Sequence, residues 1–235
     1  CPFPAVCFRR VSVVAARGSV TQAELIKENE WNNITPTIAK KVGANIYQQS
    51  LNPICILKKT ILAYFRKEYG NEFQVFEGIS PVVTTEQAFD SLLIPKDHVT
   101  RRKTDTYFVD ATHVLRPHTS AHQVDCLSKG ADSFIVVGAC YRRDEVNMTH
   151  YPVFTQMEVV RTLPRVSVIF HVNDELLPQT IIDDLKQVTD GLIHYLLGKV
   201  DDASPSLFTV DRWIDAYFPF TNPSLEVEVF RGNKW

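Results

Sequence analysis

The segment that most constrains the fold is the apolar run from Ser133 to Arg143. Its centre, Phe134–Val137, consists of residues that favour β-strands with no polar side chain among them, which predicts a strand buried on both faces. A polar stretch, Asp144–His150, follows, and the apolar pattern returns in Tyr151–Val160. Together the two runs predict a long-looped antiparallel hairpin.

Two other segments have the spacing of amphipathic helices. Asn52 is a good N-cap and Pro53 suits the first helical position, and apolar residues then recur three and four positions apart until Gly70. Thr180–Leu197 has the same spacing. Short strands or helices are expected at Phe73–Phe76, Val82–Thr85, Thr119–Lys129, Arg212–Phe220 and Leu225–Phe230. Because the elements are mixed without regular βαβ alternation, we predict an α+β fold with an antiparallel sheet flanked by helices.

The composition is that of a globular chain of 235 residues, of which 45% are apolar and 22% charged. The formal net charge is −2, so overall charge gives no signal for nucleic-acid binding. No apolar run approaches the roughly 18–20 residues of a membrane helix, and we therefore expect no membrane partner. The five cysteines are odd in number and contain no Cys-x-x-Cys pair, which favours buried thiols in a reducing compartment.

The N-terminal segment is basic and poor in acidic residues. It contains Arg9, Arg10 and Arg17, and no acid occurs before Glu24. This composition is typical of an organellar transit peptide, although a basic N-terminal strand or tail would look the same. We expect residues 1–20 to be a transit-like leader or tail, and residues 21–235 to form one domain.

The predicted hairpin carries polar side chains that could bind a small molecule. Residues two apart in a strand share a face, so Gln156 and Glu158 project together, and Arg142 projects opposite to Arg143. The planar fork of an arginine can hold a phosphate, and a Gln/Glu pair supplies acceptors for an ammonium group. The plainer interpretation is a surface Arg–Glu pair across the hairpin.

A second polar cluster lies in the sequence LRPHTSAHQ, residues 115–123. Three interpretations remain open. His118, His122 and Cys126 are four apart and could contribute to a zinc site on a helix. The hydroxyl and imidazole groups could instead bind a small polar ligand. Alternatively, Thr119 or Ser120 simply caps a helix.

Near the end of the chain, aromatic and acidic side chains alternate with other residues. Phe218 and Phe220 lie two apart around a proline, so both rings can face a substrate ring, although such pairs more often belong to a core. Glu226 and Glu228 share one face of a predicted strand. They could hold Mg²⁺–ATP or form the solvent face of an edge strand.

Four blocks of sequence, taken together, resemble one family. These are SPVVTTEQAFDSLLIPKDHV, LRPHTSAHQ, YRRDEVNMTHYPVFTQME and YFPFTNPSLEVEV. Their order along the chain and their residues are similar to those of the phenylalanyl-tRNA synthetases, which are class II aminoacyl-tRNA synthetases. The similarity is greatest to the single-chain mitochondrial form. The resemblance runs from about Gly18 to Trp235.

The resemblance implies roles for residues in the first three blocks. Pro81 resembles the proline of class II motif 1. Arg142 resembles the motif 2 arginine, a catalytic residue that binds the α-phosphate and the substrate carboxylate. The loop residues that resemble the amino-acid-binding loop are Ser120, Ala121, His122 and Gln123. Those that resemble the motif 2 loop over ATP and the tRNA acceptor end are Thr149, His150 and Tyr151. Those that resemble the segment reading the substrate amino group are Gln156, Met157 and Glu158.

For the last block, the resemblance implies that Phe218 and Phe220 contact the phenylalanine side chain. The implied activity is that of a phenylalanine–tRNA ligase, which uses phenylalanine, ATP with Mg²⁺ and tRNA(Phe). The mitochondrial matrix and a monomeric full-length form are implied in the same way.

The sequence departs from the family pattern where it stops. Motif 3 and the anticodon-binding domain of the family are not matched, so the class II catalytic domain is expected to be incomplete at its C-terminus and this chain alone to be inactive. The alternative is a non-catalytic synthetase-like binding protein or an inactive fragment.

Overall fold

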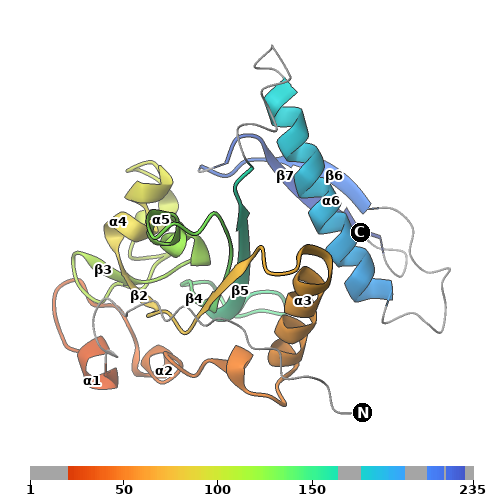
Figure 1. Ribbon diagram of the computed structural model, residues 1–235. Helices are drawn as coiled ribbons and strands as arrows, with labels where there is room; N and C mark the ends of the chain where they lie inside the picture. Colours follow the sequence, from red (N-terminus) through yellow and green to blue (C-terminus); the bar gives the residue numbers. More distant parts are fainter. Residues whose placement is uncertain (1–20, 164–175, 199–210, 220, 231–235) are drawn as a thin grey trace. The chain divides into compact units, whose positions relative to one another are not determined.

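A computed structural model describes residues 21–163, 176–198, 211–219 and 221–230, which fall into two compact units (Figure 1). The first unit comprises residues 1–56 and 69–161, and the second comprises residues 57–68 and 162–235. The expected leader, residues 1–20, lies outside the described residues. Among the described helices, none is both long enough and apolar enough to cross a membrane.

The first unit is built on a three-stranded sheet of order β1-β4-β5. The predicted hairpin is confirmed: β4 (Ser133–Tyr141) pairs antiparallel with β5 (Val153–Arg161). The third strand, β1 (Gln74–Glu77), pairs with β4 in parallel, so this sheet is mixed rather than wholly antiparallel. Local periodicity predicts where a strand lies but not its partner, which explains the difference.

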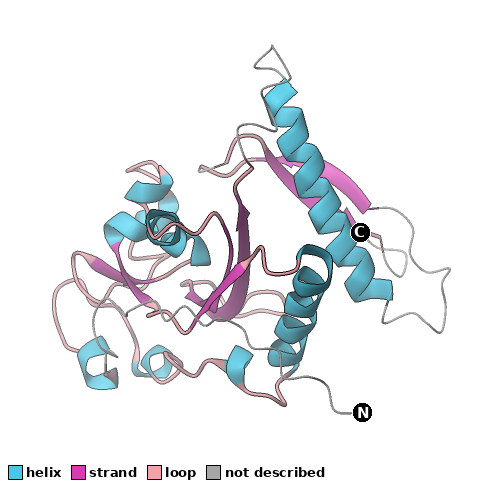
Figure 2. Cartoon of the chain, in the orientation of Figure 1, coloured by secondary structure: helices cyan, strands magenta, loops and turns pink. Residues whose placement is uncertain are grey.

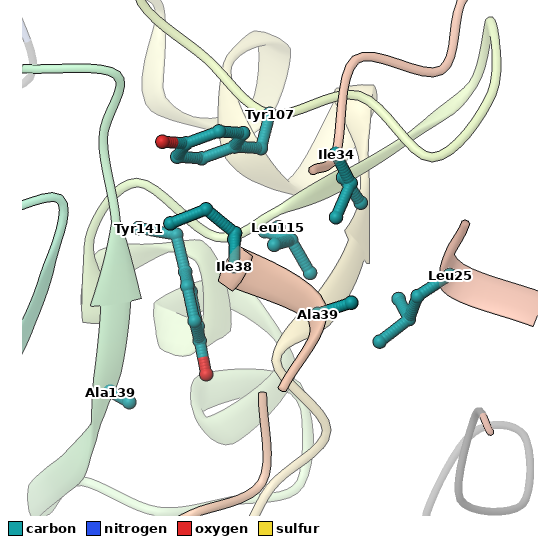
Figure 3. Close-up of a cluster of buried hydrophobic side chains, with 8 residues drawn as sticks. All are labelled: Leu25, Ile34, Ile38, Ala39, Tyr107, Leu115, Ala139 and Tyr141. Carbon is teal, nitrogen blue, oxygen red and sulfur yellow. The ribbon is translucent and has the colours of Figure 1, made fainter. Parts of the chain in front are cut away.

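β4 is buried at all nine positions, as its apolar sequence predicted. One face contributes Phe134 and Val136 to a cluster with Phe76 of β1. The other face contributes Ala139 and Tyr141 to a second cluster (Figure 3). In Figure 3, Ile38 of the N-terminal helix α2 (Pro36–Ala39) lies beside Tyr141, and Leu25 of α1 (Gln22–Leu25) lies beyond Ala39 in the same cluster. Because neighbouring residues of a strand face opposite ways, the two clusters cover opposite faces of β4.

Short elements surround this sheet in the first unit (Figure 2). β2 (Val82–Thr84) and β3 (His113–Leu115) form an antiparallel pair, in which Val82 lies opposite Leu115. Thr84 caps α4 (Thr85–Ala88) through a capping box with Gln87. The chain then leaves β3 directly into η4 (Thr119–His122) and α5 (Gln123–Ser128). The 3₁₀ helices that complete this unit are η1 (Ile46–Gln48), η2 (Asp90–Leu92) and η3 (Val99–Arg101).

The second unit contains most of α3 (Pro53–Tyr69), α6 (Leu176–Gly198) and the antiparallel pair β6 (Asp211–Ala216) and β7 (Ser224–Val229). Tyr64 of α3 donates from its hydroxyl to the Val188 carbonyl at 3.3 Å, and its ring packs against Tyr195 of α6. The indole N–H of Trp213 donates to Asp190 at 3.0 Å, which joins β6 to α6.

Helix ends follow local chemistry. The helix predicted to begin at Pro53 ends as expected before Gly70, whose φ of 61° favours glycine. The helix predicted at Thr180–Leu197 begins earlier, at Leu176, and includes Pro178 in its first turn. A proline is tolerated there because the first amides of a helix have no intrahelical acceptor.

Candidate functional site

One face of the β4–β5 hairpin carries the polar pair that the sequence singled out. Gln156 lies opposite Gly138 in the pairing register, and Glu158 lies opposite Val136. Residues directly opposite each other in an antiparallel pair, and residues two apart in a strand, project from the same face. Gln156 and Glu158 therefore project together, as predicted, beside a position on β4 that has no side chain.

The amide of Gln156 is held in a defined orientation. Its Oε1 accepts the Thr119 backbone N–H at 3.1 Å and the Cys140 thiol at 3.4 Å. A backbone N–H can only donate, so the atom that faces Thr119 must be the amide oxygen. This contact places the start of η4 directly over the Gln156 side chain.

Glu158 is a half-buried carboxylate whose bonding is incomplete. Its Oε2 is buried and has no hydrogen-bond partner within the described residues. Burial raises the pKa of Glu158 above its ordinary value, and the hydroxyls of Ser120 and Thr119 offset part of this rise. A buried carboxylate oxygen without a donor is costly, so the site favours a ligand that brings positive charge and N–H groups.

The loop over this face is buried throughout. Thr119, Ser120, Ala121 and His122 form η4 and are all buried, and Gln123 begins α5 as a partly buried residue. The helix expected within residues 119–129 is confirmed as η4 followed by α5. The expectation that Thr119 or Ser120 caps it is wrong: both lie inside η4, and within the described part of the chain neither η4 nor α5 has a side-chain cap from its N-cap residue. The loop also meets the Gln156–Glu158 face.

Two histidines of this region are held neutral. Burial, with the Arg142 charge as a smaller cause, lowers the pKa of His118 to about 4. Burial followed by the nearby Arg116 charge lowers the pKa of His122 to about 3. Both imidazoles are therefore uncharged near neutral pH.

The zinc interpretation is not supported. His122 accepts a hydrogen bond from the Arg116 guanidinium through Nε2, so a fixed positive charge occupies that nitrogen. Burial raises the pKa of the Cys126 thiol to about 11, so the free thiol is protonated near neutral pH. Among the residues that the structure describes, no group of three or more His, Cys, Asp or Glu could hold a metal ion.

Arg142 stands just beyond β4 and is exposed. Its Nε donates to the Pro117 carbonyl at 2.9 Å, and its guanidinium lies 5.1 Å from the Phe154 ring centroid. Phe154 shares a face with Gln156, since it is two residues away on β5. The guanidinium is thus anchored on one edge at the same face, while the neighbouring Arg143 donates to the Lys103 carbonyl.

The loop between the two strands is exposed and organised around Asn147. The Asn147 side-chain oxygen accepts the backbone N–H groups of Thr149 and His150 at 2.8 and 2.9 Å. Tyr151 is exposed as well, and the Lys41 ammonium lies 5.2 Å from its ring centroid. The three residues expected to cover a nucleotide therefore form a surface loop with a fixed tip.

Three further residues were expected at the site: Met157, Phe218 and Phe220. Met157 stands between Gln156 and Glu158 in β5, so its side chain points to the opposite face. Phe218 belongs to the second unit and is 38% exposed. Phe220 lies outside the described residues.

The two acidic residues of β7 also belong to the second unit. Glu226 is exposed, whereas Glu228 lies opposite Arg212 and accepts from its Nε at 2.6 Å. Their shared face agrees with the alternation of the sequence.

Sequence reasoning missed two residues of the first unit. Arg116 is buried beneath η4, but a single arginine in a sequence is normally expected at the surface. Gly138 interrupts an otherwise bulky strand, and such a glycine often marks a close approach of another group. That signal was present in the sequence and could have been used.

Comparison with known proteins adds the family context. Residues 37–235 match the family model described as tRNA synthetases class II core domain (F). The chain is 41% identical to the phenylalanine–tRNA ligase, chloroplastic/mitochondrial, of Arabidopsis thaliana, over 96% of this chain and 50% of that protein. It is 39% identical to the probable phenylalanine–tRNA ligase, mitochondrial, of Drosophila melanogaster, over 87% and 52%. For the phenylalanine–tRNA ligase, mitochondrial, of Rattus norvegicus the values are 38%, 87% and 48%. The chain spans about half the length of each of these relatives.

Proposed function

The chain belongs to the class II tRNA synthetases, core domain (F), and from that premise we propose that it forms the substrate-binding part of a phenylalanine–tRNA ligase. In this reaction, a carboxylate oxygen of phenylalanine attacks the α-phosphorus of ATP, which is bound as its Mg²⁺ complex. The bond to the bridging oxygen breaks, and pyrophosphate leaves. The phenylalanyl group then passes from AMP to a terminal hydroxyl of tRNA(Phe). Such chemistry depends mainly on positioning and charge neutralisation.

The observation that carries this proposal is the unpaired carboxylate oxygen of Glu158. The α-ammonium of an amino acid brings the charge and the N–H donors that this oxygen lacks. Ser120 lies beside Glu158, and its hydroxyl oxygen supplies a further acceptor. Gln156 lies on the same face, where its side-chain oxygen already accepts from Thr119 and Cys140. An amino acid therefore fits this face better than an anionic ligand does.

Arg142 supplies the positive charge for the phosphate and the carboxylate. Its Nε is already bonded to the Pro117 carbonyl, which aims the guanidinium without using its terminal nitrogens. The terminal nitrogens are the fork that binds phosphate or carboxylate oxygens in pairs. Preorganised donors of this kind stabilise charge that develops in a transition state.

The remaining assignments extend the proposal. Thr149, His150 and Tyr151 would cover ATP and the acceptor end of tRNA from the exposed loop. Phe218 and Phe220 would contact the phenyl ring of the substrate. Glu226 and Glu228 have the oxygen donors that Mg²⁺ prefers, and they would hold the ion that accompanies ATP; Glu228 would then share its carboxylate with Arg212.

The setting of the activity is also proposed. The three relatives named above carry mitochondrial names, one of them also chloroplastic, and we place the protein in the mitochondrial matrix. The resemblance to the single-chain form favours a monomeric full-length protein. The second candidate, a synthetase-like protein that binds phenylalanine without activating it, would use the same Glu158 site but not Arg142.

Phenylalanine-dependent exchange of pyrophosphate into ATP tests the proposal in the complete protein. Arg142→Ala should lower the exchange rate about 10²–10³-fold, as the loss of one preorganised charged donor does. Arg143→Ala is the matched control, because it removes the neighbouring arginine, whose guanidinium is bonded to the Lys103 carbonyl. Near-normal exchange in a folded Arg142→Ala protein would refute the assignment. Phenylalanine binding by the wild type without any exchange would favour the second candidate.

A further inference from the structure

Arg116 is the largest fully buried side chain among the described residues, with 1% of its surface exposed. A guanidinium is always charged, so burying it is unfavourable unless its N–H groups are bonded. Its Nε donates to the Ala139 carbonyl at 2.8 Å. Its Nη1 donates to His122 Nε2 at 2.8 Å, and to the Ile79 carbonyl at 3.4 Å.

The sheet makes room for this guanidinium at one position. A Cβ atom built on Gly138 would lie 2.1 Å from Arg116 Nη2 and 2.5 Å from its Cζ. Gly138 lies opposite Gln156, so the guanidinium occupies the space on the ligand-facing side where a β4 side chain would stand beside Gln156. Arg116 thus belongs to the floor of the site although it comes from the segment after β3.

The backbone of Arg116 is fixed as firmly as its side chain. Its N–H donates to the Pro81 carbonyl at 2.8 Å, and its carbonyl accepts the Tyr141 N–H at 3.0 Å. The residue therefore joins the segment before β2, the end of β4 and the η4 loop. Because both the backbone and the guanidinium of Arg116 are hydrogen-bonded, the side chain has little freedom to reorient and can hold His122 in place.

The contact with His122 determines the state of that imidazole. Arginine cannot accept a hydrogen bond, so His122 Nε2 must be the acceptor, and in the neutral ring the proton then resides on Nδ1. His122 is the last residue of η4, and Thr119 at the other end is bonded to Gln156. The loop is consequently held at both ends, by Arg116 and by Gln156.

We propose that Arg116 is a positioning residue for the amino-acid substrate: it holds η4 through His122, in the space left by Gly138, so that Thr119 and Ser120 stay aligned with Gln156 and Glu158. Arg116 itself touches no substrate. The inference rests on the proposed function, because it assumes that this face receives the phenylalanine ammonium. It adds a residue whose role is independent of the ATP contacts of Arg142.

Steady-state pyrophosphate exchange with the complete protein tests the proposal. Arg116→Met should raise the KM for phenylalanine about ten- to hundredfold, the effect of losing a charged hydrogen bond, and should leave the KM for ATP nearly unchanged. His122→Leu removes the acceptor and should reproduce this pattern. His122→Gln retains an acceptor oxygen and should recover most of the affinity. Combining Arg116→Met with His122→Leu should add little, since both act through one contact.

Arg101→Lys is the matched control for loss of a structural arginine. Arg101 belongs to the same unit and donates to Asp90 at 2.7 Å and to the Pro95 carbonyl at 2.8 Å, and neither acceptor belongs to η4 or β5. It should lower the melting temperature without changing the ratio of the two KM values. If Arg116→Met fails to fold, the two His122 variants decide the question alone.

The possible outcomes distinguish the positioning role of Arg116 from the proposed function. An unchanged KM for phenylalanine in the Arg116 and His122 variants would overturn the positioning role, as would an equal rise of both KM values. In either case, the proposed function would still stand if the wild type catalyses phenylalanine-dependent exchange and Arg142→Ala lowers its rate. A wild-type protein without phenylalanine-dependent exchange would overturn the proposed function, and this inference with it.

Discussion

The substitution Gly138→Ala is a sharp test of the floor of the site, because its effect depends on one neighbour. The added methyl group would lie 2.1 Å from Arg116 Nη2. Non-bonded atoms pack best about 3.5–4.0 Å apart, so the guanidinium must move by more than about 1 Å. Overpacking of this kind typically costs about 1–3 kcal/mol. An alanine in a strand would otherwise be favoured over glycine by about 0.5–1 kcal/mol.

These opposing effects can be separated by a double-mutant cycle in urea denaturation. Gly138→Ala alone should lower the free energy of unfolding. In an Arg116→Ala background the guanidinium is absent, so the same methyl group should be neutral or stabilising. The coupling energy should therefore be about 1–3 kcal/mol, the cost of the clash alone, because the gain of alanine over glycine is present in both backgrounds and cancels.

The control is Gly198→Ala, because a Cβ at Gly198 meets no atom within 4 Å. It should raise the free energy of unfolding by at most about 1 kcal/mol, and by the same amount with and without Arg116. The reasoning would be refuted if Gly138→Ala cost the same free energy with and without Arg116, since the clash would then not involve the guanidinium. The phenylalanine KM of Gly138→Ala should rise as in the Arg116 variants.

Two further predictions concern ionisable groups of the site. Glu158→Gln keeps the shape of the side chain but removes its charge, so phenylalanine affinity measured by isothermal titration should fall about ten- to hundredfold while ATP affinity persists; equal loss of both would contradict the assignment. His118 and His122 have folded pKa values lowered to about 4 and about 3, below the unfolded value of about 6.5. Between these values the unfolded chain binds more protons, so the free energy of unfolding decreases as the pH is lowered. Protonation of each histidine in the unfolded chain should lower the free energy of unfolding by about 1.4 kcal/mol between pH 7.5 and pH 5.5. In His122→Gln the contribution of His122 should be absent. The same dependence of unfolding free energy on pH in this variant and in the wild type would contradict a buried neutral His122.

The elements that sequence reasoning found were those with local signals. The unbroken β-forming run at Phe134–Val137 predicted β4, and the proline and glycine at Pro53 and Gly70 predicted the ends of α3. The alternation in β5 placed Gln156 and Glu158 on one face. In each case, the information lies within a few residues of the feature it describes.

What the sequence could not predict depends on contacts between distant segments. The parallel pairing of β1 with β4 leaves no periodic trace, so an antiparallel sheet was the simpler expectation. The burial of Arg116 follows from acceptors at Ile79, His122 and Ala139, which are separated along the chain. The expected site residue Met157 was included with its neighbours, although strand alternation directs it to the other face.

The parallel pairing of β1 with β4 also has a consequence for the order in which the chain can assemble on the ribosome. Gln74 is paired with Phe134, so the two strands are 134 − 74 = 60 residues apart in the sequence. The hairpin of β4 and β5 needs only the loop between Tyr141 and Val153 to close. β1 is synthesised first, but its backbone groups cannot pair until β4 has been synthesised. The strands that carry Gly138, Gln156 and Glu158 can pair as soon as both have been synthesised, because the loop between them is short. The face that we propose to bind substrate thus belongs to a hairpin with a short connecting loop, whereas β1, although synthesised first, pairs with this hairpin only across a longer separation in sequence.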